Sequence, residues 1–295
     1  MPTLRDIRRR ITAVASNAKI TQAMKMISAA QLRRSQEAIW NARPYAAKMS
    51  DMLGNLVEAV SEEYAHPLIR IPKTVENIAL IIIASDRGLC GGFNNSLFRF
   101  AQKYITETLI VEAPNANFHI VPVGKRSVQA YKKENYPIIK EFSGIFSGLK
   151  FSTAKEIVST VSMDFQNGKI DKVFIIYNNF KNIVTQIPTV LQLLPIVTKI
   201  NGDKDKFNAN YIFEPNQSII LDELLPKHLD IQIWRTLLES YAAEQAARMM
   251  AMENATKNAK DLIQNLELVF NKARQAAITK EMLEIVGGAE ALKKD

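Results

Sequence analysis

The chain has 295 residues, of which 47% are hydrophobic and 23% are charged, a composition typical of folded globular proteins. No apolar run reaches the roughly 20 residues that a bilayer crossing needs, and the charged N-terminus, MPTLRDIRRR, lacks the apolar stretch of a signal peptide. The single cysteine, Cys90, excludes an intramolecular disulfide and a thiolate zinc cluster. We expect a soluble intracellular protein in which Cys90 is a buried packing residue.

The net charge of +8 is concentrated at one end of the chain. Residues 1–50 carry ten Lys or Arg and two Asp or Glu, and 10 − 2 = 8, so the other 245 residues balance to zero. Such a basic segment suits nucleic acid, an anionic membrane or an acidic protein surface. Its first arginines are crowded, with almost no acid nearby, and this favours an acidic partner: Arg5, Arg8, Arg9 and Arg10.

The first predicted element is one very long helix over about residues 4–58. This stretch has no glycine before Gly54 and one proline, Pro44, and strong helix formers dominate it. We expect Pro44 to kink the helix or to mark its fraying part. Two apolar stripes are predicted along it, the first at Leu4, Ile7, Ile11, Val14 and Ala18, and the second at Ile20, Met24 and Ile27.

Residues 75–213 are predicted to form an α/β domain, because strand and helix patterns alternate there. The β-branched runs are typical of buried parallel strands. The predicted strands are 77–84, 118–123 and 172–178, and the predicted helices are 97–109, 126–134 and 154–166. Residues 182–195 predict an antiparallel strand at an edge of the sheet, where Pro188 is tolerable.

A second long helix is predicted in the C-terminal third. After Pro226, which suits the first turn of a helix, the chain runs without Gly or Pro to Val286 and stops at Gly287 and Gly288. Alternate spacings of three and four predict a coiled-coil seam. The seam residues are Met252, Ala255, Ala259, Leu262, Leu266, Val269, Ala273 and Ala276.

The two long helices are expected to pair with each other. At about 1.5 Å per residue, each is on the order of 80–90 Å long, so their lengths match. A small domain cannot cover so long an apolar stripe. We predict a long antiparallel coiled coil of N- and C-terminal helices with an inserted Rossmann-like α/β domain. The predicted parts are an N-terminal coiled-coil helix over residues 1–65, the α/β domain over 75–213 and a C-terminal coiled-coil helix over 217–295.

The stretch SDRGLCGGFN, residues 85–94, lies between a predicted strand and a predicted helix, the context of a phosphate-binding turn. It lacks the lysine of a P-loop and the spacing of a dinucleotide fingerprint. We expect a tight turn that Asp86 and Arg87 hold in place. Residues 201–207 resemble a calcium loop, but Lys206 stands where that loop needs glycine.

No catalytic constellation is apparent in the sequence. The chain has three isolated histidines, His66, His119 and His228, and none has the spacing of a metal ligand set. We expect no catalytic residue, no cofactor and no metal site.

Four blocks, in order along the chain, resemble the gamma subunit of F-type ATP synthase. They are KITQAMKMISAAQLRRSQ, SDRGLCGGFN, EQAARMMAMENATKNAKDLI and FNKARQAAITKEMLEIVGGAEAL. The C-terminal family pattern [IV]-T-x-E-x-x-[DE]-x-x-x-G-A is met at Ile278, Thr279, Glu281, Glu284, Gly288 and Ala289. The resemblance covers essentially the whole chain.

The resemblance implies a rotor shaft without chemistry of its own. In the family the paired helices stand in a hexamer of alpha and beta subunits, and the α/β domain forms a foot joined by the epsilon subunit to the membrane c-ring. Proton flow turns the ring and the shaft, so each catalytic beta subunit meets a different flank. The resemblance also implies a place at the cytoplasmic face of a bacterial inner membrane, with membrane association only through the complex and no nucleic acid partner.

The same resemblance transfers a set of contacts with the alpha and beta subunits, position by position. They are Arg8, Arg9, Met24, Lys25, Arg87, Cys90, Arg248, Gln275, Thr279 and Glu281. The last four match positions that contact a beta loop, and the turn at 85–94 becomes a corner beside the base of the shaft. Lys25 stands where the family commonly has an acidic residue. We expect it to strengthen attraction to an acidic lever of the beta subunit.

Two other classes of function stay open on the residues alone. A coiled-coil nucleic-acid-binding protein would use the basic first 50 residues, although Trp40 and Tyr45 form no aromatic ladder among the arginines. A nucleotide-dependent α/β enzyme would bind ATP as an isolated protein. With Cys90 as the only thiol, regulation by a cysteine pair within the chain is not expected.

Overall fold

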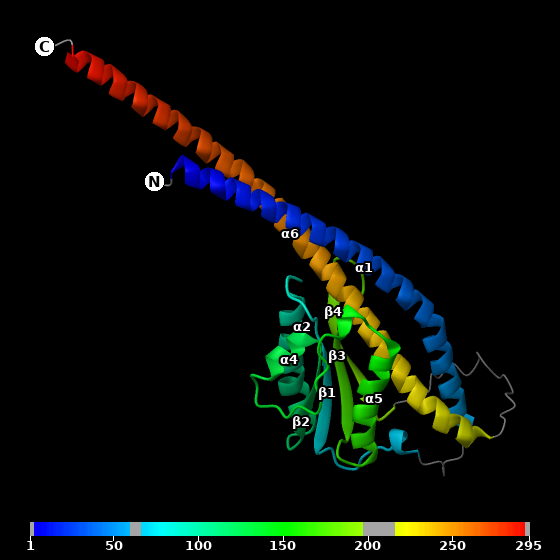
Figure 1. Cartoon of the computed structure of the whole chain (residues 1–295). Helices are drawn as coiled ribbons and strands as arrows, with labels where there is room; N and C mark the ends of the chain where they lie inside the picture. The colour runs from blue at the N-terminus through cyan, green and yellow to red at the C-terminus, as the bar shows by residue number, and fades with distance from the viewer. Residues whose placement is uncertain (1–2, 60–65, 197–215, 293–295) are drawn as a thin grey trace. The chain divides into compact units, whose positions relative to one another are not determined.

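The computed structural model describes residues 3–59, 66–196 and 216–292 (Figure 1). The helices are α1 (Leu4–Ala59), α2 (Phe93–Tyr104), α3 (Ile110–Glu112), α4 (Lys125–Tyr131), α5 (Phe151–Gln166) and α6 (Gln217–Leu292). The strands are β1 (Asn77–Ile83), β2 (Asn117–Val123), β3 (Lys172–Phe180) and β4 (Gln186–Leu194). Short helical turns lie at Pro67–Ile69, Ile105–Leu109 and Ile145–Ser147. The calcium-like stretch at 201–207 and the predicted end of the α/β domain lie outside the described residues.

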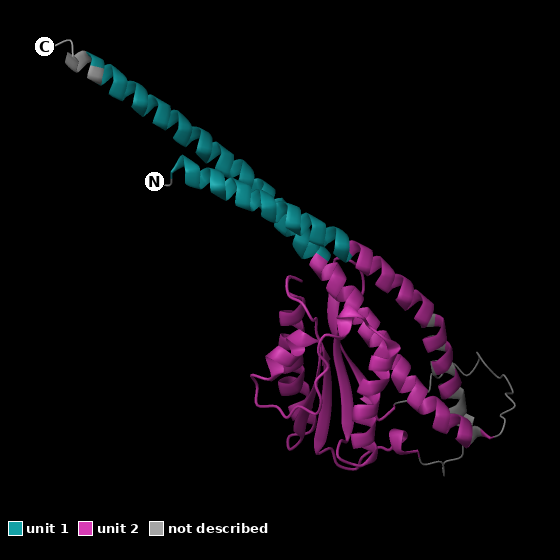
Figure 2. Ribbon diagram, viewed as in Figure 1, with its two compact units in different colours: residues 1–28, 249–295 teal, residues 29–248 magenta. Residues whose placement is uncertain are grey.

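The chain forms two compact units (Figure 2). Unit 1 comprises residues 1–28 and 249–295, and unit 2 comprises residues 29–248. Each long helix contributes one part to unit 1 and another part to unit 2. Unit 1 therefore contains the N-terminal part of α1 and the C-terminal part of α6, and unit 2 contains the sheet.

Unit 2 is built on a mixed sheet with the strand order β2-β1-β3-β4. β1 pairs in parallel with β2 and with β3, whereas β4 pairs antiparallel with β3 at one edge. The predicted parallel strands and the predicted antiparallel edge strand are both confirmed. Pro188 lies in β4 opposite Asn178, on the edge strand that can tolerate a missing amide donor.

Both faces of the sheet are buried, because successive side chains of a strand point to opposite faces. The two sets from β1 are Ala79, Ile81 and Ile83 on one face, and Ile78, Leu80 and Ile82 on the other. The first face packs against α5 and the unit 2 portions of α1 and α6, and the second packs against α2 and α4 (Figure 1). Burial on both sides explains why β1 reads as a continuous apolar run.

Helix α1 begins with a capping box formed by Thr3 and Asp6. The Asp6 N–H donates to Thr3 Oγ1 at 3.2 Å, and the Thr3 hydroxyl donates to Asp6 Oδ2 at 2.6 Å. The bonds from Thr3 stabilise the carboxylate and lower the pKa of Asp6. The helix then runs without interruption to Ala59, which confirms the single long helix predicted over residues 4–58.

Each long helix contains a proline in its interior, Pro44 in α1 and Pro226 in α6. A proline there costs about 3 kcal/mol, because a backbone hydrogen bond is lost. Burying one leucine side chain stabilises a fold by about 1.5–3 kcal/mol. The buried residues beside the two prolines are Ala46, Met49 and Leu53 in α1, and Leu221, Leu225 and Leu229 in α6. Packing therefore outweighs the lost hydrogen bonds and both helices continue.

Helix α6 begins at Gln217, the first residue of the C-terminal part predicted over 217–295, and not after Pro226, where the uninterrupted helical pattern begins. Asn216 caps it: its Oδ1 accepts from the Ile219 N–H at 2.9 Å.

Helix α6 also ends later than predicted. It continues through Gly287 and Gly288 to Leu292, so the predicted stop at the two glycines is wrong. Glycine in a helix interior costs only about 1 kcal/mol relative to alanine, which is too little to terminate a helix by itself. α1 has 56 residues and α6 has 76, so the expected match in length is wrong by 76 − 56 = 20 residues.

The two helices of unit 1 pair antiparallel, as predicted. Thr21 Oγ1 lies 2.7 Å from Thr256 Oγ1, and Lys25 Nζ lies 2.7 Å from Glu253 Oε1, so numbers rise on one helix as they fall on the other. Buried or half-buried positions on α1 include Leu4, Ile7, Ile11, Val14, Ala18, Thr21, Lys25 and Ser28. On α6 they include Met252, Thr256, Ala259, Ile263, Leu266, Phe270, Ala273 and Ala277. Both sets keep the three-four alternation of a coiled-coil seam.

Part of the predicted seam is wrong. The second apolar stripe of α1 is not the seam, because Ile20 and Ile27 are exposed, whereas polar residues continue the first stripe. On α6 the seam passes through Ile263, Phe270 and Ala277 instead of Leu262, Val269 and Ala276. At each of these points two neighbouring residues are both apolar. The hydrophobic pattern therefore could not predict which of the two is buried in the seam.

Candidate functional site

The turn at residues 85–94 joins β1 to α2 in unit 2, and the carboxylate of Asp86 holds it. Asp86 accepts hydrogen bonds from the backbone N–H groups of Lys125 (2.8 Å), Gly144 (2.9 Å) and Phe146 (2.8 Å). These donors come from two other connections, so one side chain ties three loops together. The structure confirms that Asp86 holds the turn. The side chain of Arg87 is exposed, and this residue contributes its carbonyl instead.

Ser85, Cys90 and Asn94 form a hydrogen-bonded cluster inside this turn. The Asn94 side-chain amide donates to Ser85 Oγ at 2.8 Å and to Cys90 Sγ at 3.3 Å. The Ser85 N–H donates to Asn94 Oδ1 at 3.1 Å. Cys90 is buried, as predicted, and burial raises the pKa of its thiol. A buried thiol with a raised pKa is poorly reactive.

One glycine of the turn is needed for its backbone conformation. Gly91 has a φ of +60°, a left-handed conformation that favours glycine. A Cβ on Gly88 would lie 2.7 Å from Nη2 of Arg126, the flexible end of a side chain that can move aside. Gly92 has open space around it, so its Cβ would meet nothing within 4 Å.

A buried ion pair on α6 binds the turn. Arg248 Nη1 lies 2.7 Å from Glu244 Oε1, one helical turn away, and both side chains are buried. Nη2 of Arg248 donates to the carbonyls of Arg87 and Gly88, at 3.2 Å each. We call this set, formed by Glu244, Arg248 and the two carbonyls, the clasp. Burial raises the pKa of Glu244 to about 7, against the opposing effect of the Arg248 charge.

The clasp fits a structural role better than a phosphate site. The turn presents two carbonyl oxygens to a guanidinium, and carbonyl oxygens repel an anion. A phosphate-binding turn instead directs free backbone N–H groups at its ligand.

The residues of unit 1 that were predicted to contact partners are mostly exposed. Arg8 and Arg9 are exposed on α1, and Gln275, Thr279 and Glu281 are exposed on the C-terminal part of α6. None of these five side chains packs in the core, so all are available to contact a partner. In unit 2, Arg87 is exposed, whereas the buried side chains of Cys90 and Arg248 would influence a partner only through the turn that they support.

Lys25 and Met24 lie beside each other on α1 but have different surroundings. Met24 is half-buried, and Lys25 forms the ion pair with Glu253 across the seam of unit 1. The charge of Lys25, which we expected to attract an acidic lever of the beta subunit, is therefore already paired with a carboxylate of the same chain. Partner contact by these two residues stays a prediction.

The C-terminal part of α6 forms an exposed apolar tip. It extends past the end of α1 within unit 1 (Figure 1). Its exposed apolar residues are Ile278, Met282, Leu283, Ile285 and Val286, which we call the apolar tip. Exposed apolar patches of this kind mark interaction sites in soluble proteins. Sequence reasoning missed the tip because it assumed two helices of equal length.

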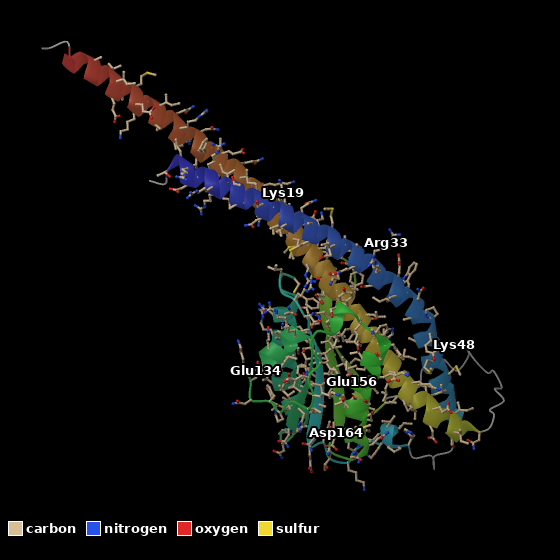
Figure 3. All side chains as sticks on the ribbon, viewed as in Figure 1. Lys19, Arg33, Lys48, Glu134, Glu156 and Asp164 are labelled. Atoms are coloured by element: carbon tan, nitrogen blue, oxygen red, sulfur yellow. The ribbon has the colours of Figure 1, made fainter. Side chains whose placement is uncertain are left out.

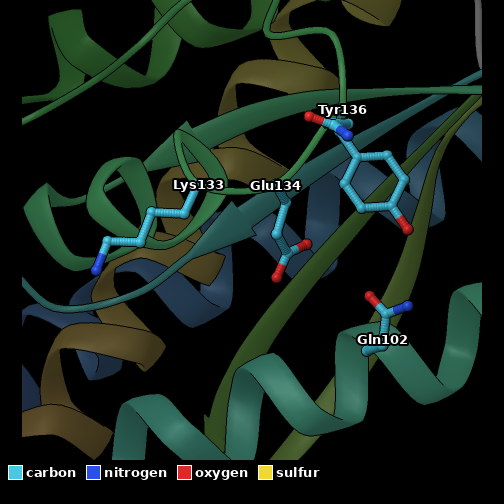
Figure 4. A pocket seen from close by; sticks show the side chains of 5 residues that line it. Gln102, Lys133, Glu134 and Tyr136 are labelled. Carbon is cyan, nitrogen blue, oxygen red and sulfur yellow. The ribbon is translucent and has the colours of Figure 1, made fainter.

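Two surface hollows lie in unit 2. The first, about 450 Å³, is lined by Gln102, Lys133, Glu134, Asn135 and Tyr136, and Figure 4 shows the side chain of Lys133 directed away from that of Tyr136. These side chains do not converge on one point, so the hollow has no catalytic geometry.

The second hollow, about 440 Å³, is lined partly by Arg33, Trp40, Phe180 and Lys181. Trp40 is 76% exposed. A large aromatic side chain so exposed, in a hollow lined by two basic residues and by Glu37 and Glu239, is a contact candidate that sequence reasoning did not propose. In the sequence, Trp40 was considered only as a possible nucleic-acid contact, although a tryptophan on a basic helix also suits a protein partner.

Within the described ranges, no group of three His, Cys, Asp or Glu residues is placed to hold a metal ion. Among the same residues, no helix is both long enough and apolar enough to span a membrane.

These features define a class of protein: a structural subunit with a paired-helix unit, an exposed apolar tip and an inserted α/β sheet whose polar clusters serve packing. A profile of the ATP synthase family matches residues 3–292. The ATP synthase gamma chain of Chlorobium limicola is 46% identical over 293 residues, which cover 99% of this chain and 100% of that one. The gamma chain of Chlorobaculum tepidum is 44% identical over 294 residues, covering both chains completely.

Solved structures show the same fold. A chain of the Tetrahymena thermophila mitochondrial ATP synthase central stalk and c-ring matches with a TM-score of 0.57 and 26% identity, covering 80% of this chain and 99% of that one. A chain of the Euglena gracilis mitochondrial ATP synthase matches with a TM-score of 0.67 and 18% identity, covering 98% of this chain and 94% of that one. The chain belongs to the ATP synthase gamma chain family, and it is a non-catalytic, central-stalk rotor subunit of that rotary complex.

Proposed function

We propose that the chain turns with the membrane c-ring and stands with unit 1 inside a head of alpha and beta subunits. Unit 2 would then join the ring through the epsilon subunit. The Tetrahymena structure contains a central stalk with its c-ring, and the Euglena structure contains F1 with its c-ring, which supports these partners. The complex would lie at the cytoplasmic face of a bacterial inner membrane, and the chain would reach the membrane only through its partners.

The observation that carries this proposal is the apolar tip. Ile278, Leu283 and Ile285 are 51%, 68% and 72% exposed on a helix that has no second helix beside it at that point. Exposed apolar side chains in such number need a partner surface, and a sleeve formed by the head would supply it. The polar residues Gln275, Thr279 and Glu281, exposed on the same stretch, would make specific contacts with beta subunits.

The basic start of α1 supports an acidic partner. Arg8 and Arg9 are exposed, and the first 50 residues carry the whole net charge of +8. Opposite charges speed association and suppress wrong partners. We infer that acidic surfaces of the beta subunits face these arginines as the chain turns.

Coupling requires that the shaft present different surfaces to the three beta subunits. Equal contact with all three would shift no equilibrium between their states. Moving a two-state equilibrium from 1:99 to 99:1 takes about 5.5 kcal/mol of differential binding. Where α1 and α6 run side by side, the exposed arginines Arg8 and Arg9 lie on α1, so the flanks of the shaft would differ in charge.

The test of the proposal is assembly and coupling of the complex with a modified tip. Leu283→Asp combined with Ile285→Asp should reduce co-purification with alpha and beta subunits and lower ATP-driven proton pumping, because two charges would enter an apolar sleeve. Gln264→Asp, at an exposed position of the same helix, is the matched control and should assemble normally. Normal assembly and pumping in the double variant would overturn the proposed seat of the tip.

Reversal of charge tests the basic flank separately. Replacing Arg8 and Arg9 by Glu should weaken assembly or coupling, because an acidic partner would then meet acidic side chains. Proton-driven ATP synthesis in membrane vesicles is the measurement. Unchanged synthesis would refute the electrostatic part of the proposal and leave the apolar part standing.

A further inference from the structure

The seam of unit 1 changes character along its length. Counting outward from the pair Thr21 and Thr256 in the antiparallel sense places seam positions of α1 opposite seam positions of α6. The opposed pairs are Ala18 and Ala259, Val14 and Ile263, Ile11 and Leu266, Ile7 and Phe270, and Leu4 and Ala273. All five are apolar. Apolar side chains attract one another without direction, so this stretch would tolerate a slide of one helix along the other.

Four residues at the inner end of this seam are polar, and they pair across it. Thr21 Oγ1 and Thr256 Oγ1 are 2.7 Å apart, and the Thr256 hydroxyl is within 2.8 Å of the Met252 carbonyl. Lys25 Nζ lies 2.7 Å from Glu253 Oε1. Thr256 is buried, whereas the side chain of Lys25 is 31% exposed and that of Glu253, at the edge of the seam, is 48% exposed. We call Thr21, Lys25, Glu253 and Thr256 the polar layer.

We propose that the polar layer sets the register of the two helices, with Lys25 and Glu253 as positioning residues. A polar residue at one seam position of a coiled coil specifies register, because any other alignment leaves it facing an apolar or like-charged neighbour. In the observed alignment, the polar side-chain groups of all four residues have hydrogen-bond partners. The hydroxyls bond to each other and to the backbone, and the ammonium meets a carboxylate.

Alternative alignments are unfavourable for this sequence. A slide of four or seven residues toward the C-terminus of α6 would place Lys25 opposite Lys257 or Lys260, which are like charges. A slide of seven residues the other way would place it opposite Ala246. In both heptad slides Thr21 would face an apolar residue, Ile263 or Met249. The observed register is the one that pairs every member of the polar layer.

Register matters for the shaft because it sets how far the apolar tip projects. A slide by one heptad moves one helix along the other by about 10 Å, at 1.5 Å per residue. Such a shift would carry the apolar tip past any surface shaped to receive it.

A disulfide reporter tests the inference. Ala18→Cys with Ala259→Cys places two thiols at opposed seam positions, and Cys90 stays in place because it is buried. The measurement is the rate of disulfide formation between the two positions under mild oxidation, in the full chain assembled in its complex. This readout does not depend on ATP turnover, so a failure of rotation in the complex would not hide it.

Charge reversal then separates register from simple packing. Lys25→Glu alone, and Glu253→Lys alone, should slow formation of the reporter disulfide at least about tenfold, the change that 1.4 kcal/mol produces. The swapped double variant should restore the rate to within about twofold. Lys19→Glu is the matched control, since Lys19 is exposed on the same helix (Figure 3), and it should leave the rate unchanged.

Each result decides the matter. Slow single variants with a restored double variant support the proposal, including the case in which a single variant does not assemble and the double variant does. Unchanged rates in the single variants would overturn it, because unit 2 alone would then fix the alignment. A double variant as slow as the single ones would also overturn it, since the pairing of the two charges would not be the cause.

Discussion

In unit 2, the guanidinium of Arg248 serves three oxygen acceptors at once: the carboxylate of Glu244 and the carbonyls of Arg87 and Gly88. All of these contacts are buried or nearly so. A buried pair is a modest source of stability while intact, but removing one partner leaves an uncompensated charge. The clasp is therefore the point at which single substitutions in unit 2 should have their largest electrostatic effect.

Arg248→Ala should lower the free energy of unfolding of unit 2 by about 1–3 kcal/mol, because Glu244 can take up a proton but the carbonyls of Arg87 and Gly88 lose their donor. Lys103→Ala breaks an exposed pair with Glu107, also one helical turn apart, and should cost no more than about 0.5 kcal/mol. Urea denaturation followed by fluorescence of Trp234 measures both. Equal losses in the two variants would show that the clasp is not buried in solution.

The clasp also predicts a pH dependence of stability. Burial raises the pKa of Glu244 from 4.5 to about 7, with Arg248 acting in the opposite direction and Asp86 and Arg87 contributing less. A raised folded-state pKa means that the folded chain binds the proton more tightly. The contribution of Glu244 is thus fully present below pH 4.5 and is lost as the pH rises through 7.

Glu244→Gln should remove this component. The difference in unfolding free energy between the original chain and the variant should change between pH 4.5 and pH 7, with the original chain losing stability relative to the variant as the pH rises. Denaturation at a series of pH values measures the difference. A difference that stays constant over this range would contradict the raised pKa.

At the level of elements, the turns that follow β1 and β2 are packed closely. Gly124 has a φ of +91°, and a Cβ there would overlap the carbonyl oxygen of Ala84. Gly144 has a φ of +76°, but a Cβ there would meet nothing within 4 Å. Substitution of Gly144 would therefore introduce backbone strain alone, whereas substitution of Gly124 would introduce both backbone strain and steric overlap.

Gly144→Ala should cost about 1–2 kcal/mol, the penalty of a left-handed conformation, and Gly124→Ala should cost clearly more because overlap with the backbone adds to it. Gly92→Ala, at a position with open space and a negative φ, is the control and should cost only about 0.5 kcal/mol, because alanine is a poorer N-cap of α2 than glycine. The midpoint of thermal unfolding ranks the three. If Gly124→Ala and Gly144→Ala proved equal, the close approach of the two turns would be refuted.

The end of α6 gives a second prediction at this scale. Gly287 lies inside the helix, where a Cβ would meet nothing within 4 Å. Gly287→Ala should stabilise the last turns by about 0.5–1 kcal/mol. Slower amide hydrogen exchange over residues 282–286 is the expected observation. Faster exchange would mean that the helix ends at the glycines, as the sequence suggested.

The strands and the existence of both long helices were predictable, because β-branched runs and the absence of helix breakers are local signals. The ends of α6 were not, since a cap at Asn216 and packing around Pro226 outweigh a strong local breaker. The predicted seam was wrong where polar residues such as Thr21 and Lys25 occupy half-buried seam positions, because a pattern of hydrophobic residues does not include them. Burial of an ion pair such as Glu244 and Arg248 cannot be read from its spacing, which is equally common on exposed helices.

At the scale of the whole molecule, each long helix belongs to both compact units, so α1 and α6 are the only described helices shared between them. A chain that transmits rotation must therefore do so through these two helices acting together. The polar layer and the apolar seam of unit 1 are the contacts that would keep them in step.

The most direct test of this account is to lock the two helices and ask whether the shaft still works. In a complex carrying Ala18→Cys and Ala259→Cys, ATP hydrolysis and ATP-driven proton pumping are measured before and after the disulfide is closed. If the helices turn as one rod, both rates stay within about twofold, since no relative motion of the helices is needed. Hydrolysis that continues while pumping stops on closure, and returns on reduction, would show that the helices must move past each other and would contradict the account.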